Sequence, residues 1–253
     1  ALASLSAKNS ENRVAIAKRL ISLLSSRVAE RAVRVLGAIS DMCMDNVANQ
    51  IAIAKASGIQ PLITWMSGGL DKLSFSAEAQ REAARAVLGV ASNNPTTQML
   101  VAKHGGIPQL IELVRQSNKE TQEFAARALW HIAGNNESKM IIAESGGIKP
   151  LVTMLSVDDV HSQELAAVVI ARLARSSNEV SSAVAESGGI LPLVRLVREE
   201  NGKPIASVTA QLQSAAAIAE VSSVPANRDL VADAGGIKPL VNCLSSSTPG
   251  IPE

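Results

Sequence analysis

The chain has 253 residues and carries 24 Lys plus Arg against 23 Asp plus Glu, which gives a net charge of +1. This balance excludes a surface that coats nucleic acid or membrane through general positive charge, so any electrostatic preference must be local. With two Phe, two Trp and no Tyr, the chain has too few aromatic residues for two or three ordinary α/β domains. Its apolar residues are mainly Ala, Leu, Ile and Val, which favours closely packed helices.

Few residues are of the kind that hold metals or form disulfides. Cys43 and Cys243 lie in predicted helices without paired spacing, and the three histidines form no HxxxH or HxxE motif. The longest apolar run, residues 165–171, is too short for a membrane span, and no secretion signal opens the chain. We expect no cofactor, metal, membrane span or small-molecule substrate, and an intracellular, cytoplasmic location with the nucleus as the alternative.

One phrase recurs five times and sets a period of about 42 residues. Its copies read SGIQPLI, GGIPQLI, GGIKPLV, GGILPLV and GGIKPLV, and they begin at Ser57, Gly105, Gly146, Gly188 and Gly235. Each glycine pair is expected to end one helix and each proline to start the next, so a phosphate-binding loop is disfavoured. The residues expected at these helix ends are Gly106, Gly147, Gly189 and Gly236. For Gly147 we predict a positive φ that a β-branched residue would adopt only with strain.

A longer apolar phrase follows in each period, and its spacing is helical. Its copies are RAVRVLGAIS from Arg31, EAARAVLGVAS from Glu82, EFAARALWHIA from Glu123, ELAAVVIARLA from Glu164 and SAAAIAEVS from Ser214. Apolar residues recur there at three- and four-residue steps, which predicts a helix with one buried face. Each period is therefore predicted as a short helix, a glycine turn, a second helix, a loop and a longer third helix.

Three helices per period, with GGIxPLV opening the second and AAxALxxIA forming the third, resemble the armadillo repeat over essentially the whole chain. The resemblance implies an all-α fold, a right-handed α-α superhelix of stacked repeats whose third helices line a concave groove. Stacking is also required on physical grounds, because one such repeat cannot bury its apolar face alone.

The period predicts where each repeat begins and ends. The five repeats are expected at residues 12–45, 46–94, 95–136, 137–178 and 179–226, with the end of a preceding repeat at 1–11 and a partial repeat and tail at 227–253. Neither end offers a polar capping face, so we expect a single solenoid that is a fragment of a longer chain. Two insertions, 67–75 and 199–208, are predicted as exposed loops. Phe75 is expected either to pack against a neighbour or to face a partner.

The resemblance also indicates which third-helix positions face the groove. In importin-type members these positions carry a Trp and, four residues later, an Asn, which together clamp an extended peptide. The aligned pairs in this chain are Arg34 and Ala38, Arg85 and Gly89, Arg127 and His131, Val168 and Arg172, and Ala216 and Glu220. Because no pair keeps the Trp or the Asn, binding of basic nuclear-localisation signals is not expected.

Arginines replace the tryptophans in three successive repeats. Together with two neighbours they form what we call the arginine stripe: Arg34, Arg81, Arg85, Arg127 and Arg172. Guanidinium groups donate paired hydrogen bonds to carboxylates, and such a groove resembles that of catenin-type members, which accept acidic extended segments. The opposing interpretation is a solvated surface of pairs such as Glu30 with Arg34, each contributing about 0.2–0.5 kcal/mol. Trp130 either borders the groove or fills space, and His131 is a candidate hydrogen-bond donor to a bound chain.

The sequence contains no GxSxG elbow, HExxH motif or strand-to-helix phosphate loop, so we expect no enzyme activity. It predicts a protein–protein interaction scaffold that binds an extended, acidic segment of another protein along the third-helix groove. The predicted partner-binding residues are Arg34, Arg81, Arg85, Arg127, Trp130, His131 and Arg172. The alternative is a structural or assembly subunit that uses its convex faces and open repeat ends. RNA binding is disfavoured by the balanced charge and the scarcity of aromatic residues.

Overall fold

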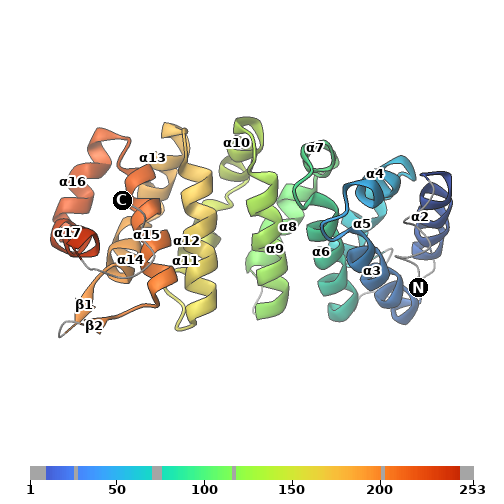
Figure 1. The fold of residues 1–253 in the computed structure, drawn as a ribbon, viewed down its shortest axis with the longest axis horizontal. Helices are drawn as coiled ribbons and strands as arrows, with labels where there is room; N and C mark the ends of the chain where they lie inside the picture. Colours follow the sequence, from blue (N-terminus) through green and yellow to red (C-terminus); the bar gives the residue numbers. More distant parts are fainter. Residues whose placement is uncertain (1–9, 26–27, 70–75, 116–117, 201–202, 246–253) are drawn as a thin grey trace. The chain divides into compact units, whose positions relative to one another are not determined.

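The computed structural model describes residues 10–25, 28–69, 76–115, 118–200 and 203–245. Within these ranges the chain forms sixteen α-helices and one two-stranded hairpin, which confirms the predicted all-α class (Figure 1). The chain divides into two compact units, residues 1–147 (unit 1) and 148–253 (unit 2). No helix within the described ranges is both long and apolar enough to cross a membrane.

The predicted order of short, second and long third helix recurs throughout the chain. The first helices are α4 (Val47–Lys55), α7 (Pro95–Lys103), α10 (Asn136–Glu144), α13 (Asn178–Glu186) and α16 (Pro225–Asp233). The second helices are α5 (Ile59–Met66), α8 (Gly106–Arg115), α11 (Ile148–Met154), α14 (Ile190–Leu196) and α17 (Ile237–Ser245). The third helices are α3 (Ala29–Cys43), α6 (Ala77–Ala91), α9 (Lys119–Ile132), α12 (Val160–Ala174) and α15 (Val208–Val221). α2 (Ser10–Leu24) precedes them as one continuous helix, at the place where the sequence lacks a glycine turn.

Short polar side chains fix where eight of these sixteen helices begin. Each accepts a hydrogen bond from a backbone N–H in the first turn, which satisfies a donor that the helix itself cannot pair. The capping residues are Asn46, Ser76, Asn94, Asn118, Asn135, Asp159, Ser177 and Ser207. The repeat therefore carries its own helix boundaries in local sequence.

The glycine pairs lie at helix C-terminal turns as predicted, but the conformation predicted for Gly147 is wrong. Gly146 has the positive φ, +74°, and the Gly147 N–H closes the turn on the Ile142 carbonyl oxygen at 2.9 Å. A Cβ on Gly147 would lie 2.8 Å from that oxygen and 3.0 Å from Ile111 Cδ1. The first glycine is thus needed for its φ, and the second because Ile142 of α10 and Ile111 of α8 lie too close for a side chain.

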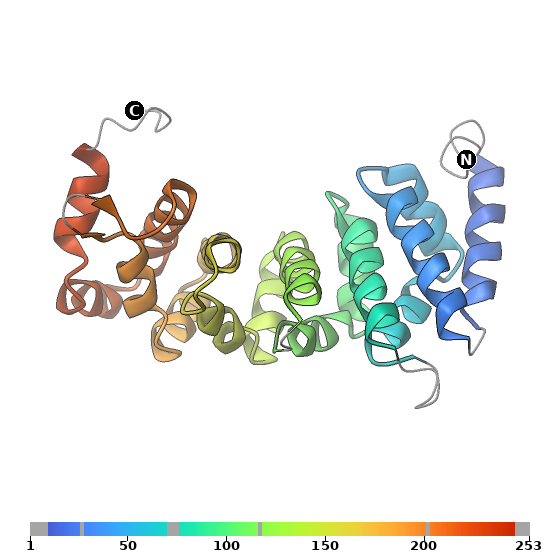
Figure 2. The same cartoon turned by 90° about the horizontal axis from the view of Figure 1, so that it is seen from below.

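Small residues allow the third helices to pack closely. Within unit 1, α3 packs against α6 and α6 against α9; within unit 2, α12 packs against α15 (Figures 1 and 2). A Cβ on Gly89 would lie 3.0 Å from the Ser40 carbonyl oxygen of α3, and Ala83, Ala84 and Ala86 of α6 are fully buried. The alanine-rich composition is therefore explained by the helix spacing.

Buried amide groups tie the repeats together. The Gln50 side chain, fully buried on α4, donates to the carbonyl oxygens of Cys43, Gly89 and Ser92 at 2.9–3.0 Å. Its own oxygen accepts a hydrogen bond from the Asn94 side chain at 3.0 Å. One side chain thus satisfies carbonyl groups at the ends of two successive third helices.

The two insertions were predicted as exposed loops, and the structure describes only one of them in large part. The insertion at 199–208, predicted as a loop, contains the antiparallel strands β1 (Glu199–Glu200) and β2 (Lys203–Pro204). Phe75 and most of the first insertion lie outside the described residues, as do residues 1–9 of the predicted preceding repeat and the tail 246–253.

Candidate partner-binding site

The third-helix face of unit 1, formed by the exposed sides of α3, α6 and α9, carries six of the seven predicted partner-binding residues. Arg34 lies on α3, Arg81 and Arg85 on α6, and Arg127, Trp130 and His131 on α9. Arg34 is strongly exposed and pairs with Glu30 on its own helix at 3.4 Å. It does not line the pocket described below, so its local setting is that of a solvated pair.

Arg81 and Arg85 belong to a chain of ion pairs that crosses three helices, which we call the ion-pair ladder. Its members, in order from α3 to α9, are Asp41, Arg85, Glu82, Arg81 and Glu120. Arg85 pairs with Asp41 and also lies 3.2 Å from Glu82. Arg81 lies 3.1 Å from Glu82 and 3.0 Å from Glu120. Carboxylates of the chain itself therefore compensate these two arginines, and an acidic ligand would have to compete with them.

Glu82 is the central member of the ladder. It is only 8% exposed, and a buried carboxylate is costly unless it is paired. The guanidinium groups of both Arg81 and Arg85 lie against it. Glu82 therefore fixes the positions of the two arginines on α6.

Arg127 is the most accessible of the arginines beside the pocket. Its side chain is 53% exposed and pairs with Glu123 on the same helix at 3.1 Å. A guanidinium carries five N–H donors in a planar fork, so one carboxylate leaves capacity for a second. Of these groups, Arg127 is the best placed to receive an external carboxylate.

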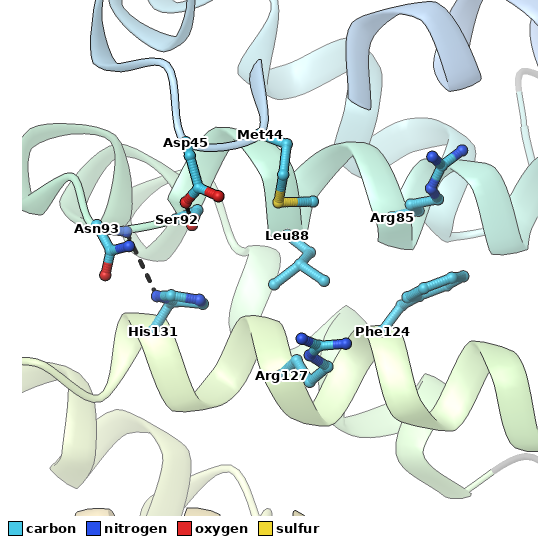
Figure 3. A pocket seen from close by; sticks show the side chains of 9 residues that line it. All are labelled: Met44, Asp45, Arg85, Leu88, Ser92, Asn93, Phe124, Arg127 and His131. Carbon is cyan, nitrogen blue, oxygen red and sulfur yellow. Dashed lines mark hydrogen bonds between the residues drawn. The ribbon is translucent and has the colours of Figure 1, made fainter. Parts of the chain in front are cut away.

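A pocket of about 220 Å³ lies between α6 and α9, beside the turn that follows α3 (Figure 3). It brings together three predicted residues, Arg85, Arg127 and His131, with six that the sequence analysis did not single out. The complete lining is Met44, Asp45, Arg85, Leu88, Ser92, Asn93, Phe124, Arg127 and His131. Figure 3 shows Asn93, Asp45 and His131 at one end, Arg85 and Phe124 at the other, and Met44 and Leu88 between them.

His131 is held by the neighbouring repeat. Its Nδ1 accepts a hydrogen bond from the backbone N–H of Asn93 at 3.4 Å, which favours the neutral tautomer with the proton on Nε2. The Trp130 ring packs edge-on against His131, with centroids 4.9 Å apart and an interplanar angle of 85°. The Trp130 ring thus packs against the imidazole ring of His131.

Arg172, the seventh predicted residue, lies on α12 in unit 2. Burial lowers the pKa of its guanidinium, and the positive charge of Arg175 lowers it further. Arg175 in turn pairs with Glu220 of α15 at 3.1 Å. Within the described ranges, the His, Cys, Asp and Glu side chains form no cluster of three or more that could hold a metal ion.

Two segments of the chain, residues 93–134 and 135–175, match the family model for the armadillo/beta-catenin-like repeat. Residues 93–175 are thus similar to two successive armadillo repeats. An engineered protein of known crystal structure superposes with a TM-score of 0.82 at 28% sequence identity, covering 92% of this chain and 90% of that one. No curated protein matches the sequence.

Designed armadillo repeat proteins share the fold. One, computationally designed for modular peptide recognition, gives a TM-score of 0.82 at 23% identity and covers 91% of this chain and 93% of its own. Another, solved in complex with the peptide (KR)4, gives 0.81 at 24% identity and covers 92% and 93%. These likenesses confirm the armadillo solenoid predicted from the repeat phrase.

The pocket residues that sequence reasoning missed carry weak signals. Phe124 lies three residues before Arg127 on the same armadillo third helix, so the two share a face. Met44 and Asp45 come just after a third helix, where the repeat phrase gives no guide to side-chain position. Asp45 and Asn93 both have positive φ, 52° and 53°, and neither is a glycine.

Proposed function

We propose that this protein is an interaction scaffold that binds an extended, acid-containing segment of a partner protein on the third-helix face of unit 1. The observation that supports this most is the pocket that gathers Arg85, Arg127 and His131 from neighbouring third helices. An armadillo fold is generally a binding scaffold, and designed proteins of this fold recognise peptides. The (KR)4 peptide of one such neighbour is basic, whereas the exposed guanidinium of Arg127 favours a carboxylate.

The ion-pair ladder restricts the form of the ligand. Because Arg81 and Arg85 are already compensated, a uniformly acidic segment gains little from them and meets repulsion from Asp41 and Glu120. One or two well-placed acidic residues suit the face better. Neighbouring third helices stand about 8–10 Å apart, so an extended segment advances about three residues per repeat.

The test uses a fluorescein-labelled twelve-residue Gly/Ser peptide that carries two aspartates and one leucine, with Asn replacing Asp in the control peptide. Reversing both Arg85 and Arg127 to Glu should weaken binding of the acidic peptide by about 2–4 kcal/mol. Arg115→Glu is the matched control, because Arg115 is also half exposed and paired with an acid but lies on second helix α8. Anisotropy titrations should be run at low and physiological salt, since screening weakens exposed charge contacts.

Equal binding of the acidic and Asn peptides, or equal effects of the groove and Arg115 variants, would contradict the proposal. Circular dichroism must be compared for each variant, because Arg127 belongs to an exposed pair, whereas Arg85→Glu removes one of the two arginines that pair with the buried Glu82. This check separates a lost contact from a lost fold.

A second function, assembly through helix faces, has its own supporting observation. Ile237 of α17 is 57% exposed, whereas the isoleucines at the same repeat position, Ile59, Ile107, Ile148 and Ile190, are at most 5% exposed. Val241, one turn later on α17, is also exposed. If this face mediates assembly, sedimentation should show an oligomer that Ile237→Asp dissociates; a monomeric parent protein would exclude it.

A further inference from the structure

The pocket between α6 and α9 has an apolar middle that the proposed function does not use. Leu88 is almost fully buried, whereas Met44 remains 40% exposed beside it. Phe124 closes the same pocket from α9. Each square ångström of such apolar surface removed from water stabilises a complex by about 25 cal/mol. An apolar group of the right size would therefore gain from entering.

The size of the pocket selects the class of ligand. Pockets that hold drug-sized molecules and cofactors enclose about 300–1,000 Å³, and this one encloses about 220 Å³. That space suits one amino-acid side chain. Its lining side chains come from both α6 and α9 (Figure 3), which suits a side chain that belongs to a chain lying across these two helices.

Charge makes the pocket asymmetric. Arg85 lies at the end opposite Asp45 (Figure 3), and Arg127 has donor capacity beyond its pair with Glu123. An acidic residue is therefore favoured on the arginine side and repelled on the Asp45 side. In an extended segment, residues i and i+2 point to the same face about 7 Å apart, close to the 5–6 Å between residues three apart on a helix, such as Phe124 and Arg127.

We propose that this pocket binds one leucine-sized apolar side chain of an extended partner segment, while Arg127 binds an acidic residue two positions away. This inference rests on the proposed function and names the residues that the site selects. It adds an apolar requirement to a site that the sequence predicted from its arginines together with Trp130 and His131. Recognition then depends on a pair of residues at fixed spacing and only weakly on the net charge of the segment.

The test compares twelve-residue Gly/Ser peptides that hold the pair in either order, Leu-Gly-Asp or Asp-Gly-Leu, each with a matched Ala-for-Leu peptide. The better-binding order should lose at least fivefold in affinity when Leu becomes Ala. Met44→Ser should cause a similar loss of affinity for the Leu peptide and almost none for the Ala peptide. In such a double-mutant cycle the contact between Met44 and the peptide leucine can be lost only once, from either partner. Met44→Leu, which keeps an apolar wall, should retain binding.

Met99→Ser is the matched control. Met99 lies on first helix α7 and is 44% exposed, close to the 40% of Met44. Met99→Ser should therefore lower the stability of the fold about as much as Met44→Ser does. It should leave the peptide affinity within twofold of the parent. The Leu-against-Ala comparison needs no protein variant and still decides the matter if Met44→Ser fails to fold.

Two outcomes would contradict the proposal that the pocket binds an apolar side chain. One is equal affinity for the Leu and Ala peptides, and the other is an effect of Met44→Ser on affinity no larger than that of Met99→Ser. If the Arg85 and Arg127 reversal still abolishes binding in either case, the proposed function stands without the pocket. If the acidic and Asn peptides also bind alike, both proposals fail together.

Discussion

The third-helix faces of the two units are built on the same repeat but differ in what they present. In unit 1 the aligned positions on α6 and α9 hold Arg85 and Arg127, and a pocket opens between the helices. In unit 2 the same positions on α12 and α15 hold Val168 and Ala216. The armadillo framework is therefore independent of the residues on its face, and function must be argued from the face.

Both faces nevertheless use ion pairs between neighbouring third helices. Asp41 of α3 pairs with Arg85 of α6 in unit 1, and Arg175, the residue that follows α12, pairs with Glu220 of α15 in unit 2. In unit 1 the paired arginine also lines the pocket, whereas in unit 2 the charge of Arg175 lowers the pKa of Arg172. The same kind of ion pair thus contributes to different local settings in the two units.

The shared framework predicts the largest effects, and they should be equal in the two units. A Cβ on Gly106 would lie 2.8 Å from the Val101 carbonyl oxygen, and one on Gly189 would lie 2.9 Å from that of Val184. Gly106→Ala and Gly189→Ala should each lower the free energy of unfolding by about 1–3 kcal/mol, because backbone must move to make room. Chemical denaturation with each variant measures this.

Gly37→Ala supplies the control for the glycine experiment. A Cβ there meets only the Glu82 Oε2 atom, at an ordinary contact distance of 3.4 Å, and alanine favours helix over glycine by up to about 1 kcal/mol. This variant should be as stable as the parent or more so. A large loss from only one of the Gly106 and Gly189 variants would mean that the two units do not share the close approach.

The ion pairs predict a smaller effect that should differ between the units. Asp41→Asn removes one of the two acids that hold Arg85, so binding of the acidic peptide should strengthen about two- to fivefold, within the range of an exposed ion pair. Glu220→Gln, the corresponding change in unit 2, should leave peptide affinity unchanged. Both variants should lose less than about 1 kcal/mol of stability.

Anisotropy titration with the acidic peptide distinguishes two roles for Asp41. Stronger binding means that Asp41 competes with the ligand for Arg85. Weaker binding would mean instead that Asp41 holds Arg85 in the orientation that the ligand needs, and the competition argument would have to be abandoned.

The fold could be predicted from the sequence because its boundaries are local. Glycine, proline and capping residues recur at corresponding helix ends of successive repeats, and the apolar spacing of the third helices needs no knowledge of distant contacts. The conformation of Gly147 could not be predicted in the same way. Either glycine of a pair can adopt positive φ, and the close approach of Ile142 and Ile111 to Gly147 decides that the second must be small.

The site was predictable only in part because its partners are distant in sequence. The pairs Glu30 with Arg34 and Glu123 with Arg127, expected from helical spacing, are present. Asp41 is 44 residues from Arg85, so a search along one helix finds only Glu82, three residues before that arginine. A search for opposite charges about one period apart would have found this pair. The apolar wall of the pocket could not be found by such a search. Met44 follows the end of a third helix, where the repeat phrase gives no guide to side-chain position.

The smallest effect expected at neutral pH concerns the reactivity of the two cysteine thiols. The cysteines lie in different units and differ in burial. Burial raises the pKa of the Cys43 thiol in α3 from its ordinary value of 9.0 to about 12. Burial, and then the charge of Glu199, also raise the pKa of Cys243 in α17, but that residue is only partly buried. At pH 8.5 iodoacetamide should therefore alkylate Cys243 in the folded protein and reach Cys43 only after denaturation, because the thiolate is the reactive form.

The raised pKa also sets the sign of a stability change with pH. The folded state favours the protonated Cys43 thiol, so this residue costs no stability below pH 9.0, and stability falls as pH rises from 9.0 towards about 12. Cys43→Ala removes this dependence while keeping a small apolar side chain. Unfolding curves of parent and variant should therefore run parallel from pH 7 to 8.5 and diverge above pH 9, with the parent losing stability faster. Parallel curves up to pH 10.5, or rapid alkylation of Cys43 in the folded protein, would mean that solvent reaches the thiol and that α3 packs less tightly against α6 than the structure indicates.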